Sequence, residues 1–292
     1  MTGSRDKPPL IVIAGATASG KSARALEWAQ REGGVVINAD ASQLYADLRV
    51  LSARPSAEEG AQVPHRLYGV RDGAHACSAA EWAALARAEI DAAHAAGQVP
   101  VLVGGTGLYL RVLLHGIAAV PPIDPEVRAQ VRALGPAAAH AALAHADPAA
   151  AARLDPADRQ RVMRALEVVR ATGRPLAQWQ TRTTGGIADA VSLRAMVVET
   201  DPALLAARIE VRLEAMLAEG ALAEVAALLA RGLHPDLPVM KAVGVRPFAA
   251  HLAGELPLAQ ALERAAAQTR QYAKRQRTWF RNQTPGWERV PG

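Results

Sequence analysis

Gly15-Ala-Thr-Ala-Ser-Gly-Lys-Ser22 is the stretch of sequence that decides the fold. It follows the apolar run Pro9-Leu-Ile-Val-Ile-Ala14 and precedes a helix-like stretch from Ala23 to Arg31. A G-x-x-x-x-G-K-[ST] pattern between a strand and a helix is typical of a phosphate-binding P-loop. Its glycines let the backbone turn tightly, so that successive N–H groups and the helix N-terminus point at phosphate oxygens.

Two side chains of this loop have a predicted chemical role. Lys21 supplies a point charge to the terminal phosphate, and the hydroxyl of Ser22 is expected to ligate Mg²⁺. The pattern leaves open whether the phosphates belong to a nucleotide or to another diphosphate. An ordinary glycine turn is the alternative interpretation, and the full motif with both flanks argues against it.

Composition narrows the class of protein. Half of the 292 residues are hydrophobic, as in folded helical or α/β proteins. No apolar stretch approaches the roughly 20 residues that span a bilayer, and no signal peptide precedes the first strand, so we expect a cytoplasmic protein without a membrane partner. The single cysteine, Cys77, excludes an internal disulfide. The net charge of +5 is mild support for a polyanionic partner.

A second and a third buried strand are predicted downstream of the P-loop. Residues 35–37 form the second, which closes with Asn38-Ala39-Asp40. Strand, helix and strand imply a parallel sheet, whose ligands lie beyond the carboxyl ends of its strands. We therefore expect Asp40 to lie near the ligand of the P-loop. The third strand, 99–103, ends in Gly104-Gly105-Thr106-Gly107, which lets a backbone and a hydroxyl approach a ligand, although a packing turn is the favoured explanation when these glycines are taken in isolation.

Strand signals are missing from about 119 to 190, where the chain is alanine-rich and dotted with helix caps, and they resume in a fourth predicted strand from Val191 to Val198. We predict an α/β fold, a P-loop parallel-sheet core formed by residues 1–118 and 191–292, with a helical insertion domain over 119–190. Within the insertion, Arg161 and Arg164 share one helix face. That face either contacts phosphates or is merely solvated.

The last predicted helix, from Leu258 to about Arg281, has two different faces. One face is basic and carries Arg270, Lys274, Arg277 and Arg281. A different face carries Tyr272, Gln276, Trp279 and Phe280. Helical charge patterns usually mix signs, yet this segment has no acid after Glu263. Charge alone leaves nucleic-acid contact and a solvated face equally open.

Seven segments of the chain, taken in order, resemble the bacterial tRNA dimethylallyltransferases. They are Gly15-Ala-Thr-Ala-Ser-Gly-Lys-Ser22, Asn38-Ala-Asp-Ala-Ser-Gln43, Pro64-His65, Val103-Gly-Gly-Thr-Gly-Leu-Tyr109, Gln160-Arg-Val-Met-Arg-Ala-Leu-Glu167, Lys241-Ala-Val-Gly-Val-Arg246 and Thr269-Arg-Gln-Tyr-Ala-Lys-Arg-Gln-Arg-Thr-Trp-Phe280. The resemblance covers about residues 10–281. The first and last segments are the most specific.

The resemblance implies an enzyme that moves a dimethylallyl group from dimethylallyl diphosphate to the exocyclic amine of the adenosine beside the tRNA anticodon, position 37. The P-loop would bind the diphosphate with Mg²⁺ on Ser22, and no nucleoside triphosphate would be consumed. The implied diphosphate-binding residues are Gly15, Ala16, Thr17, Ala18, Ser19, Gly20, Lys21 and Ser22. The implied catalytic residues are Asp40, Thr106 and Arg212. We expect the enzyme to act as a monomer.

The tRNA partner would be held at its anticodon stem-loop, in part by the helical insertion. The implied tRNA-binding residues are Asp40, Ala41, Ser42, Gln43, Thr106, Arg128, Gln160, Arg161, Val162, Met163, Arg164, Lys241, Arg246, Arg270, Lys274 and Arg277. Gln43 carries a donor and an acceptor that suit the edge of a base. The basic residues suit phosphates, which carry no sequence information.

Two of the implied roles have alternatives. Asp40 would act as a general base for the amine proton, but acids at strand ends also ligate Mg²⁺ in P-loop proteins. Arg212 would stabilise the leaving diphosphate, but a charge on a helix face also suits a surface ion pair.

The chain departs from the family pattern at three places. Asp40-Ala41-Ser42-Gln43 stands where the family usually has Asp-Ser-x-Gln, so a hydroxyl beside the acid is lost or displaced by one residue. Leu51-Ser-Ala-Arg-Pro55 replaces Gly-Thr-Ala-Lys-Pro, and Gly69 stands in place of an acid. These changes bear on the fine positioning of the substrates.

Three other functions share parts of the pattern. A small-molecule kinase would share the P-loop but predicts phosphoryl transfer from ATP. A non-catalytic RNA-binding protein with a nucleotide switch predicts no need for Asp40. An adenylate isopentenyltransferase is nearer, but it does not account for the insertion or the basic helix.

Overall fold

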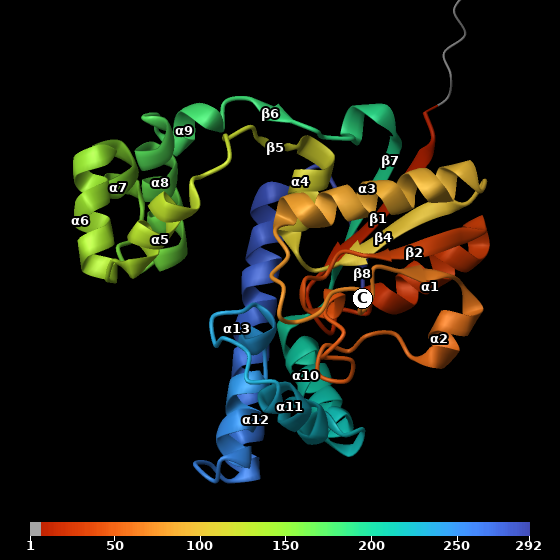
Figure 1. Ribbon diagram of the computed structural model, residues 1–292. Coiled ribbons are helices and arrows are strands. Elements are labelled where there is room, and N and C mark those ends of the chain that lie inside the picture. The colour runs from red at the N-terminus through yellow and green to blue at the C-terminus, as the bar shows by residue number, and fades with distance from the viewer. Residues whose placement is uncertain (1–6) are drawn as a thin grey trace, which may run out of the picture. The chain divides into compact units, whose positions relative to one another are not determined.

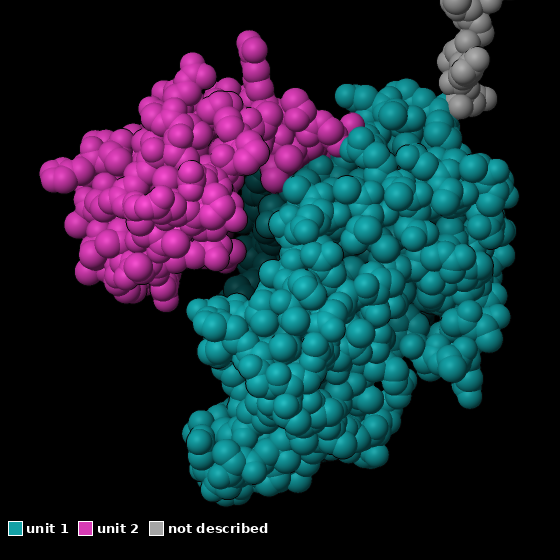
Figure 2. All heavy atoms as spheres, in the orientation of Figure 1, with its two compact units in different colours: residues 1–114, 187–292 teal, residues 115–186 magenta. Residues whose placement is uncertain are grey.

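A computed structural model describes residues 7–292, so most of the polar tail predicted over residues 1–8 lies outside the described residues. The chain forms two compact units, one of residues up to Leu114 with Ile187–Gly292 and one of His115–Gly186 (Figures 1 and 2). Each boundary of the second unit lies four residues before the expected 119–190. Among the described residues, no helix has both the length and the apolarity to cross a membrane.

The first unit contains a six-stranded sheet in the order β3-β2-β4-β1-β7-β8, and all its neighbouring strands are parallel. The strands are β1 (Pro9–Gly15), β2 (Gly34–Asn38), β3 (His65–Arg66), β4 (Val99–Gly104), β7 (Ser192–Glu199) and β8 (Glu288–Pro291). The predicted parallel α/β core is therefore confirmed. Sequence patterns predicted the four longer strands but neither edge strand, because two and four residues are too short to show a period.

Helices cover both faces of this sheet (Figure 1). Ile11 and Ile13 of β1 pack on α1 (Lys21–Glu32), whereas Leu10 and Val12, which point the other way, pack with α3 (Ala79–Ala95) and α4 (Gly107–His115). Side chains of a strand alternate between faces, so a continuous apolar run is what a strand buried on both sides requires.

A helical layer at the C-terminal end of the chain has a core of its own. It consists of α10 (Pro202–Ala218), α11 (Ala221–Ala230), η3 (Val239–Lys241), α12 (Val245–Leu252) and the long α13 (Leu258–Gln283). Its buried centre includes Leu205, Ile209 and Phe248. The far end of α13 returns to the sheet, where Phe280 lies in the same buried cluster as β1 residues. One helix thus spans both cores.

The second unit is a small helical domain. It comprises α5 (Pro125–Ala133), α6 (Pro136–Ala146), α7 (Pro148–Arg153), α8 (Arg159–Thr172) and α9 (Leu176–Trp179), with a two-stranded antiparallel pair, β5 (Ile117–Ala118) and β6 (Thr183–Thr184), near the points where the chain enters and leaves. Val131, Leu143 and Leu166 are fully buried at its centre. Pro at the first position and Asp before it start α5 and α7.

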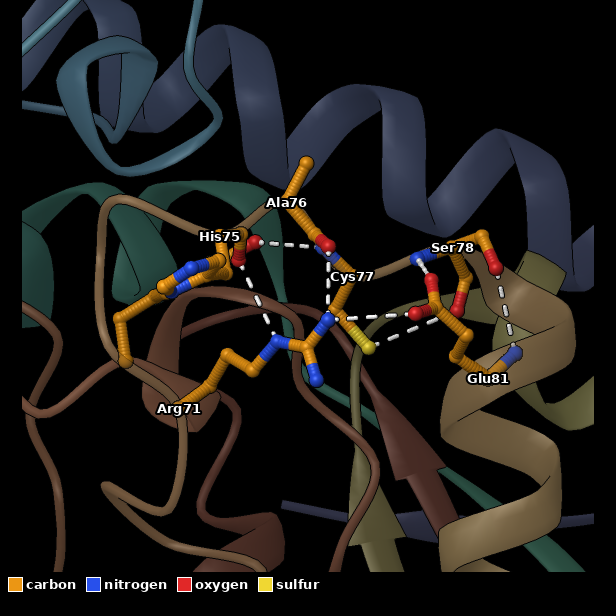
Figure 3. A network of polar contacts seen from close by, with 7 residues as sticks. Arg71, His75, Ala76, Cys77, Ser78 and Glu81 are labelled. Carbon is orange, nitrogen blue, oxygen red and sulfur yellow. Dashed lines mark hydrogen bonds and ion pairs between the residues drawn. The ribbon is translucent and has the colours of Figure 1, made fainter.

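The connection between β2 and α3 contains η1 (Ser42–Leu44) and α2 (Ala57–Gln62), and it is held in place by Arg71. The Arg71 guanidinium donates to the carbonyls of His75 and Ala76 at 3.3 and 3.0 Å and pairs with Glu81 at 3.1 Å (Figure 3). Ser78 and Glu81 form a capping box at the start of α3. A short η2 (Ala188–Ala190) leads into β7.

Candidate active site

The strand order brings the predicted site residues together. β2, β4 and β1 are neighbours in the sheet, and all three are parallel, so the segments that follow them leave the same edge. The N–H of Ala39 donates to Val103 at 2.7 Å, and the N–H of Thr106 donates back to Ala39 at 3.2 Å. Asp40, Thr106 and the P-loop therefore meet at one edge, as expected from their places at strand ends.

The P-loop has the tight backbone that its glycines permit. Gly20, immediately before α1, has φ +88°, and Ala18 is also left-handed at φ +62°. The N–H of Ser19 closes a turn onto Ala16 at 3.2 Å. A Cβ at Gly15 would lie 2.7 Å from the Ser19 hydroxyl and 3.0 Å from the carbonyl of Val198, so this position has no room for a side chain.

Lys21 is drawn back onto the loop. Its ammonium donates to the carbonyl of Ala16 at 3.2 Å. Burial lowers the pKa of Lys21 from 10.5 to about 8; the negative charge of Asp40 opposes this shift, and the positive charge of Arg212 adds to it. The side chain is mostly protonated at neutral pH. A phosphate oxygen can replace the carbonyl of Ala16 as the acceptor of its hydrogen bond.

Asp40 is held on both its backbone and its side chain. The Asn38 amide accepts from the N–H of Asp40 at 2.8 Å and donates to its carbonyl at 2.9 Å. The N–H and hydroxyl of Ser42 both donate to Oδ1 of Asp40, at 3.0 and 2.7 Å. The hydroxyl beside the acid is thus displaced by one residue and not lost. Asp40 is only 7% exposed, and Oδ2 is the oxygen left for a proton.

Thr106 links the ends of β4 and β2. Its hydroxyl oxygen accepts from the N–H of Ala41 at 3.0 Å, so the hydroxyl proton points away from Ala41 and remains available to another acceptor. The phenol of Tyr272 lies close by. Burial and then the charge of Asp40 raise the pKa of Tyr272, and hydrogen bonding to Thr106 and Gln276 partly offsets this rise. Tyr272 therefore stays protonated and can donate a hydrogen bond within the site.

The glycines around Thr106 serve close packing. A Cβ at Gly104 would overlap the backbone of Ala39, one at Gly105 would overlap the amide nitrogen of Gln276, and one at Gly107 would overlap the ring of Trp279. The packing interpretation of this turn is therefore correct for the glycines. Thr106 alone carries the side chain available for chemistry.

Gln276 of α13 is buried at the junction of two loops, with 5% of its surface exposed. Its carbonyl oxygen accepts from the N–H of Thr17 in the P-loop at 2.8 Å. Its amide nitrogen donates to the carbonyl of Gly105 at 2.9 Å. A single side chain from the end of the sequence thus holds both the P-loop and the turn before Thr106.

A cavity of about 610 Å³ opens among these groups. The catalytic and phosphate-binding candidates that line it are Thr17, Ala18, Lys21, Ser22, Asp40 and Arg212. Further cationic side chains on its wall are Arg49, Arg54, Lys241 and Arg275. The surplus of positive charge suits a diphosphate. A second hollow of about 770 Å³ shares Ala18 and Arg212 but contains neither Lys21 nor Asp40, so we place the chemistry in the first.

The loop from Arg49 to Pro55 on the cavity wall is held from two sides. The carboxylate of Glu224 in α11 accepts from the N–H groups of Arg49, Val50 and Leu51 at 2.5, 2.9 and 2.8 Å. The amide nitrogen of Gln43 donates to the carbonyls of Ser52 and Ala53 at 3.0 and 2.7 Å. The expectation that Gln43 offers a donor to a base therefore needs correction, because both N–H groups are engaged and only its carbonyl oxygen is left.

Two departures from the family pattern occupy the same space. Gly69 has φ +63°, and a Cβ there would overlap the guanidinium of Arg54. The larger arginine, where the family usually has lysine, thus fills the volume that a side chain at position 69 would need. Arg54 places a cation at the cavity wall.

The candidate tRNA-binding residues of the second unit fall into two groups. Gln160 and Arg161 are exposed, and Arg161 pairs with Asp158 at 2.8 Å. Val162 and Met163 are 1% and 9% exposed and pack in the core of the unit. The expectation that these two side chains contact tRNA is corrected accordingly, because consecutive positions of a helix point in different directions and cannot all face solvent.

Two other basic candidates of this unit are partly buried. Arg164 lies 3.7 Å from the buried carboxylate of Glu167, which Arg132 also approaches at 3.5 Å. Arg128 is half-buried on α5. The exposed parts of both guanidinium groups remain candidates for phosphate contact.

The basic face of α13 is partly neutralised by another helix. Arg270 pairs with Glu210 of α10 at 3.2 Å, a partner that the sequence of α13 alone does not reveal. Lys274 and Arg277 are exposed, as is Arg246 on α12. Lys241 pairs with the exposed Asp236 at 2.7 Å at the cavity wall.

Sequence reasoning missed Tyr272, Gln276 and Arg275 as residues of the site. The helical period places Tyr272 and Gln276 on a face that differs from the basic one. The overlooked signal is their polarity, because a polar side chain on a packing face needs a hydrogen-bond partner and here finds it in the site.

The oxygen donors of the site fit a hard divalent cation. Ser22 at the start of α1 and Asp40 line the same cavity and offer a hydroxyl and a carboxylate. The described residues contain no group of three or more His, Cys, Asp or Glu side chains that could form an all-protein metal cage. Mg²⁺ commonly binds with one or two protein oxygens, substrate phosphates and water, which matches this set.

Comparison with known proteins agrees with this geometry. The model of the IPP transferase family matches residues 43–283. The tRNA dimethylallyltransferase of Sphingopyxis alaskensis is 61% identical over 282 residues, which cover 96% of this chain and 92% of that protein. The one from Rhodospirillum rubrum is 57% identical over 281 residues, covering 94% and 86%.

Solved structures show the same fold. The tRNA isopentenylpyrophosphate transferase of Bacillus halodurans is 33% identical with a TM-score of 0.71, covering 98% of this chain and 90% of that one. A eukaryotic dimethylallyltransferase acting on tRNA is 25% identical with a TM-score of 0.84, covering 97% and 74%. This chain belongs to the IPP transferase family.

Proposed function

We propose that this chain is a tRNA dimethylallyltransferase that moves the dimethylallyl group of dimethylallyl diphosphate to the exocyclic amine of adenosine 37. The observation that carries the proposal is the meeting of Lys21, Asp40 and Arg212 around one cationic cavity at the edge of the sheet where β1 and β2 end. The names and titles of its relatives support the same substrates.

The diphosphate occupies the P-loop in this proposal. Lys21 exchanges the carbonyl of Ala16 for a phosphate oxygen, and Arg212 supplies a second positive charge from α10. As the bond between the allylic carbon and the diphosphate oxygen breaks, negative charge grows on the leaving group. Fixed positive charges in a partly closed cavity stabilise that charge more than water does.

Asp40 accepts the proton of the reacting amine. The lone pair of this amine is delocalised into the ring, so it attacks only when oriented and when its proton has an acceptor. The nitrogen forms a bond to the allylic carbon, the carbon–oxygen bond breaks, and the proton passes to Oδ2 of Asp40. Ser42 keeps Oδ1 fixed during this transfer. General bases of this kind contribute about 10²- to 10⁴-fold.

A divalent cation, which we take to be Mg²⁺, would be held by Ser22 and by oxygens of the diphosphate. When bound, it neutralises charge on the phosphates. Asp40 serves chiefly as the base in this proposal, because its carboxylate is buried and is held by Ser42, and because the next residue, Ala41, is hydrogen-bonded to Thr106.

The tRNA is bound through its anticodon stem-loop, with adenosine 37 turned out of the loop, because a stacked base cannot reach a cavity. Lys274, Arg277 and Arg246 are proposed to contact the backbone of the RNA. In the second unit, Gln160 and Arg161 are proposed to do the same. These contacts provide salt-dependent affinity without sequence information.

Transfer of radiolabel tests the proposal. Labelled dimethylallyl diphosphate is incubated with unmodified tRNA and Mg²⁺ but no ATP, and the product is digested to nucleosides. We expect label in dimethylallyladenosine. No transfer, together with phosphoryl transfer when ATP is added, would replace the proposal by a kinase.

A further inference from the structure

We propose that Gln276 is a positioning residue that clasps the P-loop to the Thr106 turn, so that the diphosphate and the reacting amine are held in register. The proposal rests on the proposed function and assigns a role to a side chain that does not line the 610 Å³ cavity. It starts from an unusual placement: one buried amide uses both its ends on backbone groups of two different loops.

The two hydrogen bonds join segments that are remote in sequence. Thr17 lies 259 residues from Gln276, and Gly105 lies 171 residues away. Gly105 has no side chain, and a Cβ there would occupy the position of the Gln276 amide. The carbonyl of Gly105 adjoins Thr106, and the N–H of Thr17 belongs to the loop that binds phosphate. The clasp therefore sets the spacing between the leaving group and Thr106.

The geometry specifies both ends of the amide. Thr17 presents a donor and Gly105 presents an acceptor, so the side chain must accept at one end and donate at the other. A carboxylate of the same shape accepts from Thr17 but opposes the carbonyl of Gly105. A protonated carboxyl group restores the missing donor. The activity of the Gln276→Glu variant is therefore expected to rise as the pH falls. A residue that only fills space would show no such dependence.

The experiment compares Gln276→Glu with the wild type and with Gln271→Glu, which makes the same change at an exposed position of the same helix. Transfer of dimethylallyl is measured from pH 6 to pH 8, as a ratio to the wild type at each pH. We expect kcat/KM for dimethylallyl diphosphate to fall at least tenfold at pH 8. The ratio should recover as pH falls, because burial raises the pKa of the introduced carboxyl group. Gln271→Glu should equal the wild type throughout.

A second readout does not depend on turnover. Binding of inorganic diphosphate with Mg²⁺ is measured by calorimetry for the same proteins, again as a ratio to the wild type. We expect Gln276→Glu to bind more weakly at pH 8 and to recover at pH 6, while its affinity for tRNA changes less than threefold. If the wild type binds diphosphate but transfers nothing, the proposed function fails and the clasp is still tested.

Several results overturn the clasp. They are wild-type activity of Gln276→Glu at pH 8, a loss of the same size at every pH, and an equal loss in Gln271→Glu. A folded Gln276→Leu variant, checked by its melting temperature, provides a further test. It removes both hydrogen bonds, so its loss should not vary with pH, and full activity in this variant would also reject the proposal.

Discussion

The strand-end site and the helical unit of residues 115–186 are built from different kinds of contact. In the site, the decisive hydrogen bonds join remote residues, such as Thr17 to Gln276 and Ala41 to Thr106. In the helical unit, many polar contacts are local, such as the pair of Arg161 with Asp158 three residues away. The site thus depends on how the whole unit folds, whereas the helical surface depends on the sequence around each turn.

This difference in contacts suits the proposed role of each region. Group transfer needs reacting atoms placed within fractions of an ångström. The loops that carry these atoms must therefore be held in fixed positions relative to one another. Phosphate contacts on RNA need positive charge within reach and tolerate variation in geometry. We therefore expect single substitutions in the site to change rates by orders of magnitude and those on the helical surface to change affinity by small factors.

The largest effect should come from Asp40→Asn. The amide cannot take the amine proton, so kcat should fall by roughly 10²- to 10⁴-fold. Affinity for tRNA, measured by filter binding, should stay within a factor of about three, since this change leaves the basic surfaces intact. Asp91→Asn, an exposed change on α3, is the matched control. A parallel loss of tRNA affinity would argue against the role as base.

A smaller effect is expected for Lys21→Met. It removes a charged hydrogen bond to the diphosphate, worth about 1.5–3 kcal/mol, so kcat/KM for dimethylallyl diphosphate should fall roughly 10- to 150-fold. Steady-state kinetics with tRNA at saturation measure this change, and the exposed Lys7→Met serves as control. Unchanged kinetics would mean that the loop amides suffice for diphosphate binding.

The pH dependence of the same step follows from Lys21. Its pKa is lowered to about 8 in the free protein, so it loses its proton and its charge as pH rises through that value. Below about pH 8 the ammonium is charged and diphosphate binding is strongest. We expect kcat/KM for dimethylallyl diphosphate to decline above pH 8, at most about tenfold per pH unit. Lys21→Met should lack this decline; its persistence in that variant would assign the titration to another group.

The smallest effects are expected on the helical unit. Arg161→Ala should weaken tRNA binding by a few fold and lower the slope of log affinity against log salt by about one, as for the loss of one phosphate contact. The exposed Arg31→Ala, on α1, should leave both quantities unchanged. Titrations at several salt concentrations measure the slope.

The neighbouring Val162→Ala provides the opposite test. Val162 is buried in the core of the unit, so its truncation should lower thermal stability without altering the salt slope. A change of slope in Val162→Ala, or none in Arg161→Ala, would remove the distinction between the two faces of α8.

Much of the site could be predicted from the sequence because its parts are local patterns. The P-loop is eight consecutive residues, and Asp40 follows an apolar run whose end must lie at the sheet edge. The parallel sheet follows from alternation of strands and helices. The absence of strand patterns predicts a helical insertion over 119–190, and the second compact unit runs from His115 to Gly186.

Other features depend on pairing between segments whose register no local pattern contains. The displaced hydroxyl of Ser42 reaches Asp40 only because the turn after β2 folds back, and Arg54 fills the space above Gly69 only when two loops meet. The sequence of the last helix offers Arg270 no nearby acid, but in the structure Arg270 forms an ion pair with Glu210 of α10. Val162 and Met163 match the family motif and yet lie in the core.

The sequence by itself determined the chemistry available to this protein: a phosphate loop, an acid at a strand end and a basic final helix. The tertiary structure alone decided which backbone groups the α13 side chains hold, above all Thr17 and Gly105 by Gln276. The reason is physical. Periodicity assigns a side chain to a face, but the atoms it meets depend on how strands are ordered and helices packed, and that is a property of the whole chain.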